Sequence, residues 1–326
     1  MKIVKKECVR EGGRVALCTL GSINWGAFKN PQDMRKACRV LVRSLSNLLQ
    51  YQDFLSVQSF LANREFEPLG VGITNLAYWH ARRSFKYGEP EALATVKRWM
   101  EAQAFYLTEM SVELAEERGA CERSKDTWYG KGVFPWERRA AGVNELTDFT
   151  PTMEWEPLRE RMLISGIRNA TLMAIAPVES SSVVLNSTNG IEQPMELISV
   201  KESKAGSFVQ VVPEYKRLKN RYQLMWDQTD CVDYLKTAAV LAAYVDQSIS
   251  TNTFYNPAHY EGGKVPGTII AANLMLGVHW GLKSYYYSLI NKTGSKASLE
   301  ESNNVIEAVF TQPVQLEDED CEACKL

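Results

Sequence analysis

The sequence lacks the patterns that mark disulfide-stabilised domains, zinc sites and membrane spans. Its seven cysteines are an odd number without regular spacing, and its three histidines, His80, His259 and His279, lie far apart. No group of cysteines and histidines has zinc-ligand spacing. No run of about 18 apolar residues is free of charges, and the charged start of the chain has no apolar signal-peptide segment. We therefore expect a cytoplasmic protein with reduced thiols, no metal site and no membrane association.

An excess of charge of one sign is also absent. The 37 Lys and Arg residues nearly balance the 39 Asp and Glu residues, and the net charge of −2 gives no reason to expect nucleic-acid binding. What is present is typical of a globular protein: 45% hydrophobic residues, 8 Trp and 14 Tyr in 326 residues. This length exceeds that of a usual domain, but α/β barrels of this size form single units.

The hydrophobic pattern alternates between the strand and helix periods. We expect strands at 14–24, 168–177 and 283–288, a strand or tight turn at 68–74, helices at 33–49, 90–119, 232–249 and 268–278, and a loop-rich stretch at 122–152. Strands that alternate with helices predict a parallel sheet with crossover helices. The fold class is therefore α/β.

A serine-rich loop, Pro177-Val178-Glu179-Ser180-Ser181-Ser182, follows the apolar segment 168–177. It would lie at the carboxyl end of a strand, where α/β folds bind ligands, and its backbone N–H groups and hydroxyls suit a phosphate. A serine-rich turn that caps the next element explains the same residues. When the loop is considered alone, the second interpretation is the simpler one.

Two cysteines, Cys321 and Cys324, stand in a C-x-x-C pattern after the acidic stretch 315–320. Such a stretch cannot bury itself, so we expect a flexible arm that could carry a dithiol to a distant redox site. Incidental cysteines at a frayed terminus are an equally good interpretation, because C-x-x-C alone is a weak motif.

Three tyrosines and one cysteine lie in two of the expected strands, 283–288 and 14–24. Tyr285, Tyr286 and Tyr287 are consecutive, and they indicate either ordinary aromatic packing or phenols that carry a one-electron oxidation. Periodicity does not decide between these interpretations. Cys18 lies in the segment 14–24, where an inert buried thiol is the default expectation.

Six blocks of this sequence, in family order, resemble the C-terminal part of the large, catalytic subunit of class I ribonucleotide reductases. They cover nearly all of the chain from about residue 12. The blocks are 16–20, 51–53, 69–73, 168–182 with 189–192, 246–253, and 283–287 with the terminal cysteine pair. The resemblance implies the C-terminal half of a ten-stranded α/β barrel: a variable leader at 1–13, the half-barrel at 14–295 and a flexible redox-active tail at 296–326.

The resemblance also implies a reaction, in which ribonucleoside diphosphates become deoxyribonucleotides by thiyl-radical chemistry. Cys18 matches one member of the cysteine pair that supplies the reducing equivalents. The residues Pro177, Val178, Glu179, Ser180 and Ser181 match the segment that holds the substrate phosphates, chiefly with backbone amides. Val178 replaces a small polar residue, a change that removes one hydroxyl contact and leaves amide donation intact.

The remaining matches concern electron transfer. Tyr286 and Tyr287 match the stacked pair that relays a radical from the metal-bearing small subunit, whereas Tyr285 stands where the family has an aliphatic residue and is expected to pack. Cys321 and Cys324 match the tail dithiol that reduces the active-site disulfide and is re-reduced by thioredoxin or glutaredoxin. We expect this chain itself to bind no cofactor.

One family motif is missing. The radical cysteine lies in an Asn-x-Cys-x-Glu pattern upstream of the Cys18 strand, and Cys8 has neither partner residue. We therefore expect half of an active site from a split, phage-type subunit that needs an N-terminal large-subunit polypeptide and the small subunit. The alternative is a non-catalytic remnant that binds the small subunit or thioredoxin. The presence of Cys18, the tyrosine pair and the tail thiols together argues against a remnant.

Overall fold

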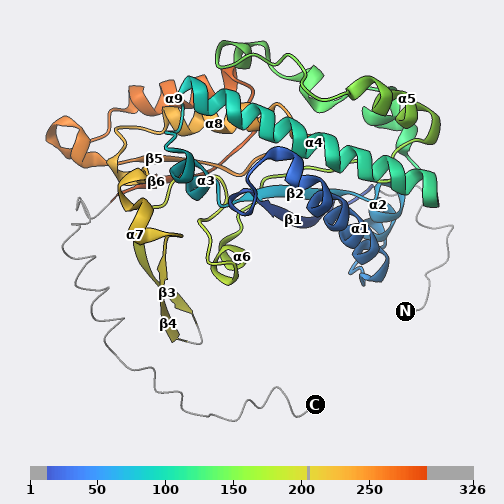
Figure 1. Ribbon diagram of the computed structural model, residues 1–326, viewed down its shortest axis with the longest axis horizontal. Helices are drawn as coiled ribbons and strands as arrows, with labels where there is room; N and C mark the ends of the chain where they lie inside the picture. Colours follow the sequence, from blue (N-terminus) through green and yellow to red (C-terminus); the bar gives the residue numbers. More distant parts are fainter. Residues whose placement is uncertain (1–12, 204–205, 292–326) are drawn as a thin grey trace, which may run out of the picture.

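The computed structural model describes residues 13–203 and 206–291 (Figure 1). The predictions for Cys8, Cys321, Cys324, the leader and the tail therefore lie outside the described residues. The model confirms the α/β class, with helices packed around short pairs of strands. No helix of the described ranges is long and apolar enough to cross a membrane.

The strands form three two-stranded sheets in the described ranges. Strands β1 (Thr19–Asn24) and β2 (Leu69–Thr74) pair in parallel, as do β5 (Thr251–Tyr255) and β6 (Tyr285–Ile290). Strands β3 (Ile198–Ser203) and β4 (Gly206–Val211) form an antiparallel hairpin, which projects downward in Figure 1. The parallel pairs confirm the predicted sheet type. The hairpin was not predicted, because its polar residues give no clear alternation.

The segment 168–177 connects the two parallel pairs but is not the regular strand that we predicted. On one side Leu172 O accepts a hydrogen bond from Val71 N at 2.8 Å, and on the other Ile175 bridges Ile249 in parallel. The N–H groups of Leu172 and Met173 instead donate to the Asp246 carboxylate, at 2.6 and 2.9 Å. A side chain therefore takes the donors that a strand ladder would need.

The helices are α1 (Arg35–Tyr51), α2 (Val57–Phe66), α3 (Leu76–Arg83), α4 (Pro90–Arg118), α5 (Trp155–Ser165), α6 (Glu179–Val184), α7 (Tyr215–Leu218), α8 (Val232–Ala242) and α9 (Gly267–His279). The predicted helices in α1, α4 and α9 are confirmed within two residues at each end. The prediction of 232–249 was too long, because α8 ends at Ala242 and the chain then turns toward Asp246. Short 3-10 turns fill 124–145, which confirms the loop-rich stretch.

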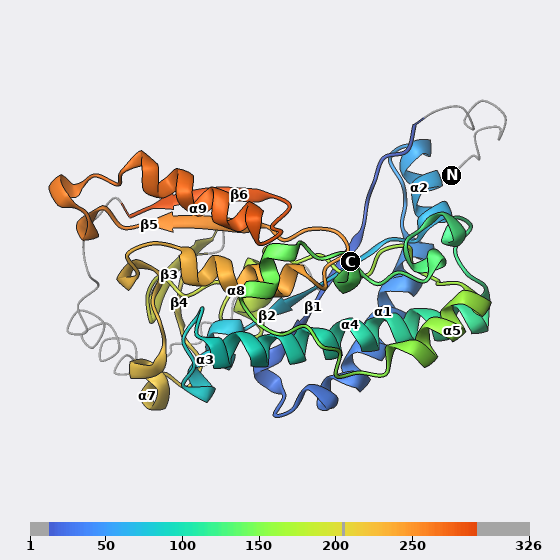
Figure 2. The ribbon, with the colours of Figure 1, turned by 90° about the horizontal axis from the view of Figure 1, so that it is seen from above.

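Helix α4, the longest helix in the described ranges, packs against α1, α5 and α8 (Figures 1 and 2). Its Gln103 donates to Gly72 O of β2 at 3.2 Å and accepts from Trp25 Nε1 at 2.7 Å. Trp25, Trp79 and Trp99 pack around this point with ring centroids 5.2 to 5.6 Å apart. These contacts join α4 to the sheet through the main hydrophobic core.

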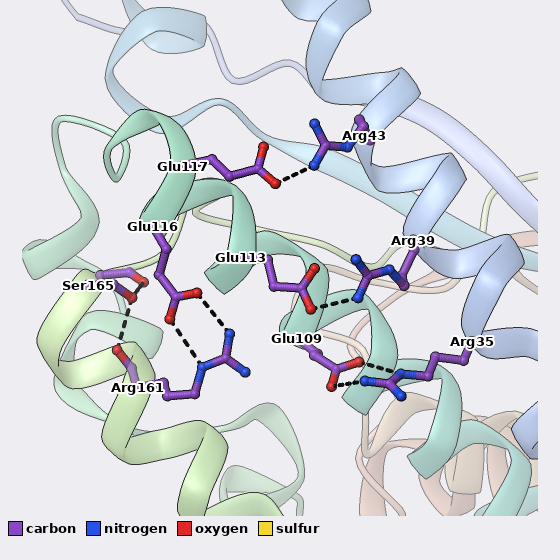
Figure 3. A network of polar contacts seen from close by, with 10 residues as sticks. Arg35, Arg39, Arg43, Glu109, Glu113, Glu116, Glu117, Arg161 and Ser165 are labelled. Atoms are coloured by element: carbon purple, nitrogen blue, oxygen red, sulfur yellow. Dashed lines mark hydrogen bonds and ion pairs between the residues drawn. The ribbon is translucent and has the colours of Figure 1, made fainter.

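Three ion pairs connect α1 to α4, as Figure 3 shows. They are Arg35–Glu109 at 2.6 Å, Arg39–Glu113 at 2.6 Å and Arg43–Glu117 at 2.5 Å. Both members advance by four residues from pair to pair, so the two helices run in the same direction with one pair per turn. On the other side of α4, Glu116 pairs with Arg161 of α5 at 2.9 Å.

The prediction of a buried strand over 14–24 was wrong in extent and burial. Strand β1 begins at Thr19, and the side chains of Val15, Leu17 and Leu20 are exposed. Within the described residues β1 pairs with β2 alone, so its other edge is open. An apolar sequence without a second neighbouring strand explains both differences.

Candidate active site

Cys18 precedes β1 and is half-buried rather than fully buried. Its thiol lies against Gly70 of β2: a Cβ atom on this glycine would be 3.1 Å from Cys18 Sγ and 3.2 Å from Ala174 Cβ. The missing side chain of Gly70 therefore leaves room for the Cys18 thiol and for Ala174 of the segment 168–177. Burial raises the pKa of the Cys18 thiol, and the Asp246 charge raises it further. The thiol is therefore protonated at neutral pH.

Asp246 is the polar centre of this region. Its carboxylate accepts hydrogen bonds from the N–H groups of Leu172 and Met173 and from Tyr129 Oη at 3.0 Å. Burial raises the pKa of Asp246 to about 6, although the three donors and Lys283 oppose this change. Asp246 therefore fixes the segment that faces Cys18. The block 246–253 carries part of the family resemblance, but the sequence alone indicates no role for the Asp246 carboxylate.

Lys283 connects the same region to β6. Its Nζ donates to the carbonyl oxygens of Val245, Asp246 and Gln247 at 2.9, 3.0 and 2.6 Å. These bonds satisfy carbonyl groups in the turn after α8. Because Lys283 stands two residues before β6, the turn that carries Asp246 and the start of the tyrosine strand are held together.

The serine-rich segment is a loop only at its start. Pro177 and Val178 lead into α6, which begins at Glu179, so that Ser180 and Ser181 are helical and exposed. Ser182 is buried, where its N–H donates to Val178 O at 2.8 Å. The prediction of one continuous loop was therefore wrong at its end. The first N–H groups of a helix have no partner within it, so the amides of this turn retain the capacity to bind an anion.

Tyr286 and Tyr287 are brought together by an irregularity in β6. Thr251 of β5 pairs with Tyr285, but Thr253 pairs with Ser288, so three steps on β6 match two on β5. The extra residue is a β-bulge, which disturbs the alternation that sends successive side chains to opposite faces. The two rings accordingly lie in contact in a tilted arrangement, with centroids 4.1 Å apart and an interplanar angle of 53°.

Tyr285 differs from its two neighbours. It is half-buried against the core, and its Oη donates to Leu274 O of α9 at 2.7 Å. The expectation that Tyr285 packs is confirmed by these contacts. The hydrogen bond with Tyr287 raises the pKa of Tyr286, and the Glu179 charge of α6 raises it slightly more. The tyrosine pair is thus near the serine-rich segment.

Comparisons with known proteins agree with the sequence resemblance. A family model described as the ribonucleotide reductase barrel domain matches residues 6–288. The chain is 39% identical over 277 residues to the ribonucleoside-diphosphate reductase subunit alpha of Haemophilus influenzae, a match covering 85% of this chain and 37% of the relative. It is 34% identical over 319 residues to the protein of that name from Enterobacteria phage T4, covering 96% and 40%. The chain spans about two fifths of the length of these relatives.

Proposed function

The chain belongs to the ribonucleotide reductase barrel-domain family, and from this membership we propose that it forms part of a ribonucleoside-diphosphate reductase. The observation that carries the proposal is the contact between the rings of Tyr286 and Tyr287, which occupy the positions that the family resemblance gives to the radical relay. The reaction removes the 2′ hydroxyl of a ribonucleoside diphosphate as water, and a cysteine pair supplies two electrons and becomes a disulfide.

In this proposal Cys18 is one of the two reducing cysteines. Its raised pKa keeps the thiol protonated, so the sulfur can deliver hydrogen to the substrate rather than act as a thiolate. In the segment Pro177 to Ser181, the backbone N–H groups of Glu179, Ser180 and Ser181 hold the substrate phosphates, because proline has no N–H and that of Val178 donates to Asn189 Oδ1. The acidic side chain of Glu179 points to backbone N–H groups, rather than side-chain charge, as the source of phosphate affinity.

The proposed enzyme needs further chains. An N-terminal large-subunit polypeptide supplies the radical cysteine, and the small subunit supplies the metal-radical cofactor. Among residues 13–203 and 206–291 only β2 pairs with β1, and the exposed side chains of Val15, Leu17 and Leu20 support a partner on this side. Residues 14–295 would form the half-barrel, residues 1–13 the leader and residues 296–326 the redox-active tail. The complex would work in the cytoplasm with thioredoxin or glutaredoxin as its reductant.

The tyrosine pair provides the main test. Tyr286→Phe and Tyr287→Phe should each abolish turnover in the reconstituted complex, because phenylalanine keeps the ring but cannot be oxidised at a phenol. Tyr285→Phe is the matched control, since it removes only the hydrogen bond to Leu274 O. Deoxyribonucleotide formation is measured with all chains present. Loss of turnover in Tyr285→Phe alone would contradict the assignment of the relay.

A second test separates Cys18 from the tail thiols. Replacing Cys321 and Cys324 with Ser should allow one turnover and stop repeated turnover with thioredoxin, and dithiothreitol should restore part of it. Cys18→Ser should prevent turnover with either reductant. Product is counted per active site by rapid quench. A complex with all partners and no product at all would favour the alternative, a remnant that binds the small subunit or thioredoxin without catalysis.

A further inference from the structure

The bulge that brings the two phenols together has a single residue opposite it. Thr251 and Thr253 of β5 pair with Tyr285 and Ser288, so Asn252 faces both Tyr286 and Tyr287. The N–H of Tyr287 donates to the side-chain oxygen of Asn252, Oδ1, at 2.9 Å. In a regular parallel ladder this donor would bond to a backbone carbonyl. A side chain therefore completes the strand pairing at the bulge.

The orientation of the Asn252 amide is determined by its two partners. A backbone N–H can only donate, so the atom that faces Tyr287 is the oxygen. The amide nitrogen, Nδ2, then donates to Glu192 Oε1 at 2.5 Å. The pKa of Glu192 is raised overall, because burial raises it more than the hydrogen bond from Asn252 lowers it. The buried Glu192 carboxylate thus accepts a hydrogen bond from Asn252, and this bond prevents rotation of the Asn252 amide.

Packing alone does not hold the phenols. The side chains of Tyr286 and Tyr287 are 53% and 57% exposed, so their relative position depends on the backbone beneath them. A bulge without a partner for its extra residue leaves an N–H free and the strand able to shift. Asn252 supplies that partner. Glu192 stands two residues after Gly190, in the segment whose Asn189 accepts from Val178 N at 3.3 Å.

We propose that Glu192 and Asn252 are positioning residues for the tyrosine pair, with Glu192 fixing the Asn252 amide and Asn252 fixing the bulge. This role gives the proposed relay its geometry and in that respect rests on the proposed function. The contact between the phenols, however, can be measured on the full chain without any turnover.

The test is the titration of Tyr286, carrying 3-fluorotyrosine at that position, followed by fluorine NMR in the full chain. Tyr287→Phe defines the midpoint when the partner hydroxyl is lost, and it should lie below that of the unsubstituted chain. Asn252→Ala should move the midpoint at least half of the way to this value. Glu192→Leu should do the same, whereas Glu192→Gln keeps an oxygen acceptor and should restore the original midpoint.

Ser288→Ala is the matched control, because it removes another side-chain bond between the same strands, from Thr253 Oγ1 at 3.0 Å. It should leave the midpoint unchanged. If Asn252→Ala lowers the melting temperature markedly, Asn252→Leu replaces it, since leucine keeps the volume but can neither accept from Tyr287 N nor donate to Glu192.

An unchanged midpoint in Asn252→Ala or its Leu replacement, or in Tyr287→Phe, would overturn the proposal. Activity of the reconstituted complex separates the positioning role of Asn252 from the proposed radical relay. A shifted midpoint with full turnover would keep Asn252 as a positioning residue and refute the proposed relay. A shifted midpoint with reduced turnover supports both.

Discussion

The buried carboxylate of Glu101 allows a quantitative prediction about stability. Glu101 lies in α4 with no exposed surface and accepts five hydrogen bonds: from Lys97 Nζ at 2.8 Å, Thr152 N and Oγ1 at 2.7 Å each, Met153 N at 3.0 Å and Trp155 Nε1 at 3.1 Å. One side chain therefore fastens the end of the loop-rich stretch and the start of α5 to the central helix.

Glu101→Gln keeps the shape of the side chain and removes its charge. The ammonium group of Lys97, only 3% exposed, would lose its counter-charge, and the new NH₂ group would face donors. Breaking a buried ion pair from one side costs about 3–5 kcal/mol. Glu117→Gln is the matched control in the same helix. Its partner Arg43 and Glu117 itself are 38% and 46% exposed, so solvent screens the pair and the loss should be far smaller than for Glu101→Gln.

Urea unfolding followed by circular dichroism measures both free energies of unfolding, provided that the slopes agree. Adding Lys97→Met to Glu101→Gln should recover much of the loss, because no buried charge remains. Burial alone would raise the pKa of Glu101, but the bonds from Lys97 and Thr152 lower it overall. Its contribution is therefore complete above the unfolded pKa and disappears as the pH falls through the folded one. Equal costs for Glu101→Gln and Glu117→Gln would refute this reasoning.

Two other changes test the surroundings of the thiol. Gly70→Ala puts a Cβ atom 2.7 Å from Leu20 Cδ2 and 3.1 Å from Cys18 Sγ, so it should cost about 1–3 kcal/mol and speed alkylation of Cys18 by displacing the thiol. Gly267→Ala, with nothing within 4 Å, is the control, and mass spectrometry follows the alkylation. The folded pKa of Asp246, about 6, is above its unfolded value, so the folded state binds more protons at a pH between these two values. The free energy of unfolding should therefore fall as the pH rises through this window, by up to about 3 kcal/mol. Asp246→Asn should remove that fall in urea midpoints, and an unchanged pH dependence would show that the carboxyl is not buried as described.

The parts of the fold that depend on local signals could be predicted from the sequence. The helix predicted at 90–119 is found at Pro90–Arg118, because a proline begins it and Gly119, at φ +87°, ends it. The strand predicted at 168–177 was wrong because a residue far away in the sequence determines its hydrogen bonds. Its apolar residues indicate a strand, but Asp246, more than 70 residues later, takes the N–H groups of Leu172 and Met173.

In the candidate site, too, residues with a local sequence signal could be predicted and long-range contacts could not. The tyrosine pair and Cys18 could be identified from short sequence blocks, since the residue types themselves carry the resemblance. The bulge could not, because a strand pattern gives each residue one face and does not reveal an extra residue opposite Asn252. Glu192 is 60 residues away from Asn252 in the chain, and only the folded structure shows that they are bonded.

The environment of Cys18 bears on why the proposed enzyme would need a second dithiol. A thiolate of the reductant attacks a disulfide, and the reaction slows when the sulfur is poorly accessible or the leaving thiol has a high pKa. Burial and the Asp246 charge both raise the pKa of Cys18, and its sulfur lies against Gly70. These features suit a protonated hydrogen donor to a bound substrate, but they oppose direct exchange with a folded external reductase. A thiol adapted to the first task needs a carrier for the second, and this is the role that we propose for Cys321 and Cys324.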